Sequence, residues 1–308
     1  MRLATVSRVH WRWCDGRVWS ILRATALATF GASAIACDGG SAGPAAVPEP
    51  THGGPGVRIV SLSPGITATV CALGARGALV GRTPWCVGVD EVPVVGTLLD
   101  FHAERMIEAR PTAILVQPPA QGVSEPLMRL ADEKAWTVYR HELESIDDVR
   151  ALLASLPSEL APDARDPRSA SLRSESARLR GELDGALAPL SGASALGRTL
   201  VLVASGESPE AMAFGSGTYL AQALRAMGVT LALERGGYPA LSLEAIASVA
   251  PDTIILIGKG GAMLATRLAP LVPQARCVRL DGAGLLQPGA AMIGELNQLR
   301  ALLAEYAQ

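Results

Sequence analysis

The chain has 308 residues, of which 49% are hydrophobic, 18% charged and 4% aromatic, and its formal net charge is −2. Domains usually contain about 100–200 residues, so this length predicts two compact units. The apolar half is sufficient to build hydrophobic cores and excludes a disordered chain. The small net charge argues against nucleic-acid binding, which needs a basic face.

The first 36 residues have the organisation of a secretory leader. Several arginines stand against a single acid, and an uncharged stretch of small and apolar residues follows from Ala24 to Ala36. A basic region, a short apolar core and a small-residue cleavage site are typical of a secretory signal. The apolar run has about 13 residues, whereas a spanning helix needs about 20. Residues 1–36 are therefore predicted to be a signal peptide.

Cys37 follows the small residues Ser33-Ala-Ile-Ala, a placement that resembles a bacterial lipobox. It predicts that this cysteine becomes a lipid-modified N-terminus, although Ala34 stands where a larger aliphatic residue is usual. Ordinary cleavage after Ala36 is the alternative. Residues 37–56 lack apolar periodicity and are predicted to form a flexible tether. The expected location is periplasmic or extracytoplasmic, with membrane attachment only through a lipid anchor.

The body of the chain contains an internal repeat. An apolar run over 58–62 and the helical pattern after it are repeated at 199–203 and 219–227. A second set of positions recurs 140 residues later: Glu104, Ile107, Pro111, Ile114 and Leu115 correspond to Glu244, Ala247, Pro251, Ile254 and Ile255. Alternating strands and helices predict two α/β lobes, Rossmann-like and with mostly parallel sheets, over residues 57–165 and 191–308.

Residues 166–190, between the lobes, have the pattern of one long helix. Asp166 fits the N-cap position and Pro167 the first helical position. An apolar stripe at helical spacing is formed by Leu172, Leu179, Leu183, Leu187 and Leu190. About 22 residues at ~1.5 Å each give a rod of about 33 Å, which would join the lobes and resist wide opening. The alternative is that this helix belongs to one lobe.

Several segments match one protein family in chain order. They are 58–67 (RIVSLSPGIT), 72–74 (ALG), 79–81 (LVG), 93–96 (PVVG), 104–111, 213–218 (AFGSGT) and 236–251, with Asp281 and Pro288 in a last loop. They resemble the bacterial solute-binding proteins of ABC transporters, and within these the cobalamin- and siderophore-binding class. The resemblance covers roughly residues 57–305. It implies two α/β lobes, a connecting helix, a ligand cleft between the lobes, an importer permease as partner and no catalysis. We expect a monomer.

Ligands of open α/β sheets bind beyond the carboxyl ends of the strands. This rule selects the loops 63–66, 84–87, 96–101, 117–122, 211–218, 235–240 and 281–288. Trp85 and Tyr238 lie in these loops, one in each lobe, and large rings offer contact area to a flat apolar ligand. The alternative for both rings is that they pack within their own lobes. The alternative for Ser216 is that it belongs to an ordinary glycine-rich turn. The expected ligand-binding residues are Ser63, Pro64, Trp85, Cys86, Leu98, Gln117, Phe214, Ser216, Tyr238 and Asp281.

The resemblance to the cobalamin-binding members is incomplete at these loops. Trp85 and Tyr238 match positions where those members place aromatic rings. Two other positions that are often aromatic are Leu98 and Gln117 here. The last loop keeps Asp281 but has Ala, Gly and Leu where charged residues are expected.

The charge of the candidate loops bears on the ligand. Their cations are few, chiefly Arg82 and Arg235, whereas anionic ferric siderophores usually require arginine or lysine partners. A nearly uncharged corrinoid fits better, so we expect the chain to capture a cobalamin-like corrinoid for an ABC importer. A ferric siderophore, or haem with Tyr238 or Cys86 as axial ligand, is the alternative. A sensor or scaffold without transport is another.

Glu104 and Glu244 occupy equivalent positions of the repeat. Both begin predicted helices, where the helix dipole favours a carboxylate. The resemblance implies a second role, in which one exposed glutamate per lobe docks onto arginines of the permease.

Four cysteines follow the leader, and lipidation of Cys37 would leave three, Cys71, Cys86 and Cys277. Cys71 and Cys277 are expected to be buried apolar residues. Cys86 is expected beside Trp85 in the cleft, where pairing with Cys71, metal ligation and a free thiol all remain open.

Catalytic motifs are absent from the sequence. It contains no phosphate-binding Gly-x-x-x-x-Gly-Lys, no His-Glu-x-x-His and no Cys-x-x-Cys, and its one Gly-x-Ser-x-Gly match (39–43, GGSAG) lies in the predicted tether. We therefore expect no enzyme activity and no resident cofactor, the ligand being a cobalt corrinoid or an iron chelate. His102 and His141 are isolated and expected at the surface, with a chelate site of His102 and Cys86 as a minor alternative.

Overall fold

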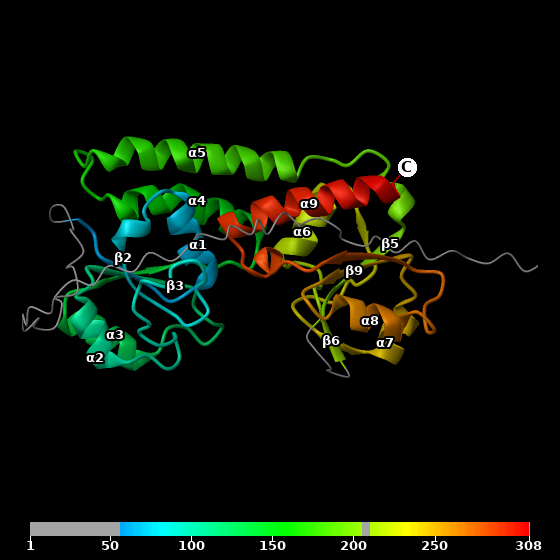
Figure 1. The fold of residues 1–308 in the computed structure, drawn as a ribbon, viewed down its shortest axis with the longest axis horizontal. Coiled ribbons are helices and arrows are strands. Elements are labelled where there is room, and N and C mark those ends of the chain that lie inside the picture. The colour runs from blue at the N-terminus through cyan, green and yellow to red at the C-terminus, as the bar shows by residue number, and fades with distance from the viewer. Residues whose placement is uncertain (1–55, 205–209, 308) are drawn as a thin grey trace, which may run out of the picture. The chain divides into compact units, whose positions relative to one another are not determined.

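The computed structural model describes residues 56–204 and 210–307, which form an α/β fold with two sheets (Figure 1). The first sheet has the order β2-β1-β3-β4, and all its neighbouring strands are parallel. Its strands are β1 (Ile59–Ser61), β2 (Leu79–Arg82), β3 (Ala113–Val116) and β4 (Thr137–Arg140). Its helices are α1 (Pro64–Ala72), α2 (Ala103–Ala109), α3 (Glu125–Glu133) and α4 (Ile146–Leu160), with a 3₁₀ turn at Arg76–Ala78. These elements form the first lobe.

The second lobe is built on a mixed sheet of order β10-β9-β5-β6-β8, with β7 also paired to β5. Its strands are β5 (Arg198–Val203), β6 (Glu210–Ala213), β7 (Thr230–Leu231), β8 (Ala240–Ser242), β9 (Thr253–Ile257) and β10 (Arg276–Leu280). Its helices are α6 (Tyr219–Ala226), α7 (Leu243–Val249), α8 (Gly261–Leu268) and α9 (Ala290–Tyr306), with 3₁₀ turns at Ala193–Leu196 and Gly284–Leu286. β10, β9, β5 and β7 are parallel, whereas β6 and β8 pair antiparallel.

The structure confirms the internal repeat at its offset of 140 residues. α2 and α7 begin 140 residues apart, and each has seven residues. Both end at a non-glycine residue in the left-handed region, with φ of 44° and 47°, before a proline and a buried strand. The same bond closes both units: the Arg58 N–H donates to Thr112 Oγ1 (2.9 Å), and the Arg198 N–H to Asp252 Oδ2 (2.7 Å). The lobes are thus two copies of one plan.

One long helix, α5 (Arg168–Ala186), lies between the two lobes in the chain. It starts later than predicted, but the Asp166 carboxylate still caps it by accepting a hydrogen bond from the Arg168 N–H (2.9 Å). The five leucines of the predicted stripe are all buried. α5 packs against α4 of the first lobe and α9 of the second (Figure 1), so it is shared by both lobes.

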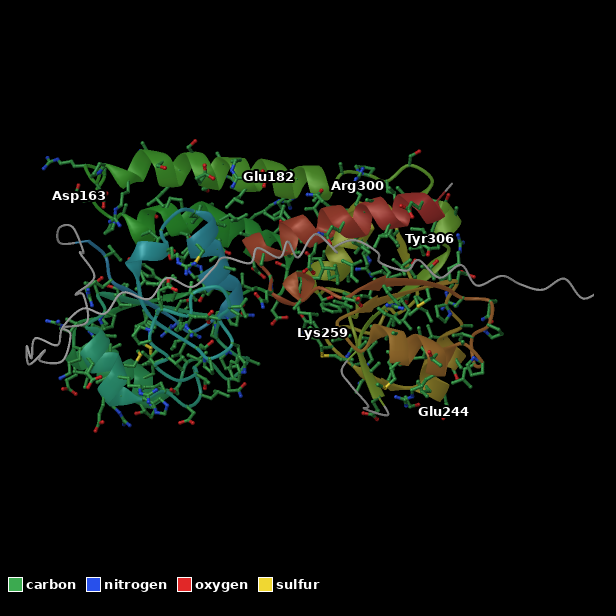
Figure 2. All side chains as sticks on the ribbon, in the orientation of Figure 1. Asp163, Glu182, Glu244, Lys259, Arg300 and Tyr306 are labelled. Carbon is green, nitrogen blue, oxygen red and sulfur yellow. The ribbon has the colours of Figure 1, made fainter. Side chains whose placement is uncertain are left out.

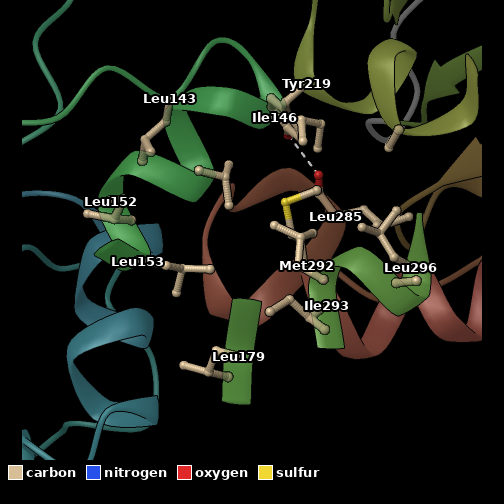
Figure 3. Close-up of a cluster of buried hydrophobic side chains, with 14 of the residues drawn as sticks. Leu143, Ile146, Leu152, Leu153, Leu179, Tyr219, Leu285, Met292, Ile293 and Leu296 are labelled. Carbon is tan, nitrogen blue, oxygen red and sulfur yellow. Dashed lines mark hydrogen bonds between the residues drawn. The ribbon is translucent and has the colours of Figure 1, made fainter. Parts of the chain in front are cut away.

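One apolar core continues through both lobes beneath α5. Figure 3 shows part of it, with buried side chains from α4, α5, α6 and α9, from the loop after β4 and from the 3₁₀ turn before α9: Leu143, Ile146, Leu152, Leu153, Leu179, Tyr219, Leu285, Met292, Ile293 and Leu296. Two smaller cores lie on the other faces of the sheets, one with α2 and α3 and one with α7 and α8. Separating the lobes would expose the shared core to water, which the hydrophobic effect opposes.

Residues 56–204 and 210–307 contain no helix that is both long and apolar enough to cross a membrane. The predicted signal peptide, the lipidated Cys37 and nearly all of the tether lie outside these residues. Within them, Cys71, Cys86 and Cys277 are free thiols, so Cys86 is not paired with Cys71. Burial raises the pKa of Cys277 to about 11, which keeps that thiol protonated at neutral pH.

Candidate functional site

The carboxyl ends of the parallel strands define one edge in each sheet, called here the contact edges, and elements next to the two edges touch. Gly65, in the first turn of α1, faces the loop between β10 and α9: a Cβ there would lie 2.4 Å from the Pro288 carbonyl oxygen. The start of α4, which follows the loop after β4, also reaches the second lobe, since the Ile146 N–H donates to Gln222 Oε1 (3.0 Å). Segments that follow strands of different lobes are thus neighbours, as a shared ligand site requires.

The loops after β1 and β3 are joined by a side-chain bond. Ser63 Oγ donates to Gln117 Oε1 (3.1 Å), and Ser63 is buried whereas Pro64 and Gln117 are half-buried. The Ser63 hydroxyl is therefore occupied by its neighbour. The amide NH₂ of Gln117 has no hydrogen bond recorded in the described part of the chain, so it is the donor that this pair offers to a ligand.

Trp85 projects from the loop after β2, and 62% of its surface is exposed. Its neighbour Cys86 anchors the loop: its thiol is 2% exposed and lies 3.1 Å from Thr67 Oγ1 and 3.2 Å from Thr83 Oγ1. The expectation that Cys86 contacts the ligand therefore finds no support, because the thiol points into the core and away from water. The same burial removes it as an axial ligand for haem in this conformation.

Arg82 is buried and committed to its own loop. Its guanidinium donates to the carbonyl oxygens of Val92 (2.9 Å), Thr83 (3.2 Å) and Cys86 (3.2 Å), and it lies 3.6 Å from Asp90. A group with this many partners is a structural clamp. The first lobe thus offers less positive charge to a ligand than its sequence indicated.

Three aromatic rings form a row in the second lobe. Phe214 packs edge-to-face on Tyr219 (centroids 5.6 Å apart, 81°) and on Tyr238 (5.4 Å, 73°). Phe214 and Tyr219 are buried, while Tyr238 is 38% exposed. Edge-to-face contacts favour one fixed arrangement of the rings. Tyr238 therefore presents its ring from a rigid support, and Phe214 acts as that support rather than as a ligand contact.

The loops that carry Phe214 and Tyr238 are bonded to each other. The Gly215 N–H donates to the Gly237 carbonyl (2.8 Å), and the Ser216 N–H to that of Arg235 (3.0 Å). The Ser216 hydroxyl donates to the Glu234 carbonyl, so it is engaged within the protein and the expected ligand bond from it finds no support. A Cβ at Gly215 would lie 2.0 Å from the Arg235 carbonyl oxygen, so this approach requires glycine.

The Tyr238 phenol stays protonated over the physiological range. Burial, with a smaller contribution from the Glu144 carboxylate, raises the pKa of Tyr238 to about 12. Glu144 belongs to the loop after β4, so a charge of the first lobe acts on a ring of the second. A protonated phenol serves as a hydrogen-bond donor and an apolar face, whereas ligation of ferric iron would first require loss of the proton.

The loop after β10 is held from two sides. Glu295 of α9 accepts hydrogen bonds from the N–H groups of Gly284 (2.8 Å) and Leu285 (2.9 Å). The Tyr219 hydroxyl donates to the Leu285 carbonyl (2.7 Å), a bond drawn in Figure 3. Asp281, at the start of this loop, is exposed and lies 4.0 Å from the Arg279 guanidinium. Tyr219 is a positioning residue that has no signature in the sequence, because its partner is 66 residues away.

Lys259 is a second feature that the sequence reasoning missed. It follows β9, the strand between β10 and β5, and stands at the contact edge of the second sheet (Figure 2). It is exposed, and the preceding Gly258 has φ of 99°. The rule that selects loops after parallel strands applies to residues 258–260 as well, and applying it to β9 would have found this cation.

Two predicted positions differ in the structure. Leu98 is buried in the core beside α2 and α3 and does not line an open edge. His141 is not a surface residue: its Nε2 lies 2.9 Å from Glu159 Oε2, and each residue is only 9% exposed. His102 is exposed. Among the described residues no group of three or more His, Cys, Asp or Glu side chains could hold a metal ion. The alternative of a chelate site formed by His102 and Cys86 disagrees with the burial of the Cys86 thiol.

Glu104 and Glu244 both lie in the first turn of a short helix, α2 and α7, and both are exposed. α2 and α7 lie on the side of their lobes away from α5 (Figure 1), and Figure 2 shows Glu244 there. The pKa of Glu244 is lowered by hydrogen bonds from its own backbone N–H and from Ser242. Both carboxylates are thus available on one side of the molecule.

The chain matches no protein-family model, and no curated protein matches it in sequence. Solved structures do resemble it. The periplasmic heme-binding protein BhuT, in complex with two hemes, is 23% identical with a TM-score of 0.65, and the match covers 82% of this chain and 99% of that one. The vitamin B12-binding protein BtuF of Vibrio cholerae is 15% identical with a TM-score of 0.62, over 82% and 98%.

A third structure extends the range of ligands. The petrobactin-binding protein YclQ from Bacillus subtilis is 15% identical with a TM-score of 0.58, over 82% of this chain and 92% of that one. At these identities the likeness shows the fold alone. The chain has the two-lobe α/β fold of these periplasmic binding proteins, and no closeness to the vitamin B12 binders in particular is established.

Proposed function

We propose that this chain is an extracytoplasmic solute-binding protein that captures a bulky, flat metal chelate for an ABC importer. One observation carries the proposal: Trp85 and Tyr238, the exposed aromatic rings of the two contact edges, belong to different lobes that touch next to these edges. Rings of this kind bind flat apolar ligands with little loss of side-chain entropy. The fold of the structural neighbours supports the same conclusion at the level of architecture.

The preferred ligand within this class is a corrinoid. Arg82 is engaged by backbone carbonyls, so the first lobe has little free positive charge for an anionic siderophore. Cys86 is buried and the Tyr238 phenol holds its proton, which disfavours both axial ligands considered for haem. Lys259 favours an anionic ligand instead, because an exposed lysine can pair with a carboxylate or phosphate of the ligand. A ferric siderophore or haem is therefore kept as the second candidate.

The remaining roles follow from this proposal. The chain would act without catalysis or a resident cofactor, deliver its ligand to a permease, and use Glu104 and Glu244 as the two docking carboxylates. It would be a monomer held near a membrane through a lipid on Cys37. A sensor or scaffold with the same fold would bind no chelate, or would bind one without transport.

Calorimetry with cyanocobalamin, ferric haemin and a ferric catecholate siderophore tests the proposal. We expect one of the three, cyanocobalamin first, to bind with micromolar or better affinity, about −8 kcal/mol or more. Replacing Trp85 or Tyr238 by alanine removes roughly 1.5–3 kcal/mol of apolar contact, a loss of about 10- to 100-fold. The matched control is Leu271→Ala, an exposed apolar residue away from both contact edges. No heat with any of the three probes would refute the proposal.

A further inference from the structure

The first residues of helices α4 and α9 are capped from the opposite lobe. α4 begins at Ile146, whose N–H donates to Oε1 of Gln222 on α6 (3.0 Å). α9 begins at Ala290, whose N–H donates to Oγ1 of Thr69 on α1 (3.0 Å). The N–H groups of the first helical turn have no partner within their own helix. In both helices a side chain of the other lobe supplies it.

The two caps are related by the repeat of the fold. α4 follows β4 and α9 follows β10, so each is the last helix of its lobe. α1 and α6 are the first helices of their lobes. The first helix of each lobe thus caps the last helix of the other, in both directions. Because the same capping relation occurs in both directions, it belongs to the architecture of the two lobes rather than to one side chain.

Each capping side chain is also bonded to its own contact edge. Gln222 Nε2 donates to the Gly217 carbonyl (2.9 Å), in the loop that carries Phe214. Thr69 Oγ1 donates to the Gly65 carbonyl (2.7 Å), in the turn that follows Ser63. Each side chain therefore joins a loop at one edge to a helix of the other lobe.

The junction around Thr69 leaves no space for a replacement partner. Thr69 is fully buried, and a Cβ at Gly289 would lie 2.5 Å from its hydroxyl oxygen. Water cannot enter such a contact, so removal of the hydroxyl leaves a buried N–H without a partner, which is unfavourable. Apolar packing in the shared core has no preferred direction, whereas a hydrogen bond does.

We propose that Thr69 and Gln222 are positioning residues that fix the separation of the two contact edges. The shared core and α5 hold the lobes together, and the two reciprocal caps set their angle. This inference concerns the folded chain without ligand. A negative result for Thr69 and Gln222 would not bear on the proposed ligand class. Equally, the absence of binding by all three ligand probes would not bear on the role of these two residues.

The test measures the distance between the lobes by double electron–electron resonance. Spin labels are attached through p-acetylphenylalanine at Glu108 of α2 and Ser248 of α7, which are exposed and 140 residues apart, so the native cysteines stay unlabelled. The full chain without ligand should give one narrow distance distribution. The Thr69→Val/Gln222→Met double variant, close in volume, should give a distribution about twice as wide or a shifted mean.

Matched controls keep the same chemistry away from the junction. Thr266→Val removes a hydroxyl bonded within α8, and Gln298→Met removes an exposed amide of α9. Both should retain the native distribution. Thr69→Ser keeps the hydroxyl that donates to the Gly65 carbonyl and accepts from the Ala290 N–H, and it should retain the native distribution as well. A double variant that melts cooperatively and gives the native distribution would overturn the proposal. If the double variant does not fold, a Gln222→Met or Thr69→Val single variant that folds and gives the native distribution would overturn it instead.

Discussion

The buried hydrogen bond between the Tyr219 hydroxyl and the Leu285 carbonyl can be removed by deleting a single oxygen atom. Tyr219→Phe deletes the hydroxyl and keeps the ring that packs edge-to-face on Phe214. Tyr219 and Leu285 are both buried, so the carbonyl left behind has no access to water. The cost of an unsatisfied buried acceptor is about 1–3 kcal/mol. We expect a loss of unfolding free energy in that range.

Urea unfolding followed by circular dichroism measures this change. The midpoint should fall while the dependence on urea stays constant, because the folded surface is nearly unchanged. Tyr139→Phe is the control: it makes the same change at a half-buried tyrosine of the first lobe, and it should stay within about 0.5 kcal/mol of the unmodified chain. A Tyr219→Phe variant that is equally neutral would refute the assignment of Tyr219 as the clamp of the loop after β10.

Three further predictions concern docking, a close contact and titration. A Glu104→Ala/Glu244→Ala double variant should keep ligand affinity, measured by calorimetry, and lose uptake in a transport assay; unchanged uptake would remove the docking role. Gly215→Ala should cost several kcal/mol in urea unfolding, because its Cβ would meet the Arg235 carbonyl oxygen at 2.0 Å; a neutral result would contradict that contact. The pKa of Tyr238 is raised to about 12, above the ordinary value of about 10, so its contribution to stability is complete below pH 10 and is lost as pH rises through 12. At pH 11 a phenol with this pKa is still largely protonated, so the unmodified chain and Tyr238→Phe should show the same phenolate absorbance. A larger absorbance of the unmodified chain would contradict the raised pKa of Tyr238.

The repeat and the long helix were predictable from the sequence because both depend on local patterns. The offset of 140 residues is visible in pairs such as Glu104 and Glu244, and the structure has equal helices at both places. The leucine stripe of 166–190 predicted a helix, and its five leucines are buried. The helix is shorter than predicted, since it runs from Arg168 to Ala186.

The direction of individual side chains was not predictable in the same way. Cys86 and His141 were placed in the cleft and at the surface, and both are buried. The partner of His141 is Glu159, 18 residues later, and Thr67 lies 19 residues before Cys86. Such pairs have no signature in periodicity or spacing, since only the packing of separate elements brings them together.

The fold alone does not determine which chelate is bound. Structures with this architecture are described as binding heme, vitamin B12 or petrobactin. A shared fold hosts different ligands because a few side chains at the site decide the chemistry. Here the decision rests on Trp85, Tyr238 and Lys259, of which the sequence reasoning identified the two rings and overlooked the lysine.

The structure of a complex with whichever of cyanocobalamin, ferric haemin or the siderophore binds most tightly tests the central claim most directly. We expect the chelate to lie between the two contact edges and to touch both Trp85 and Tyr238. A chelate bound elsewhere would contradict it. One such place is the cavity of about 360 Å³ between the end of α1 and the start of α5, lined by Cys71 and Arg168.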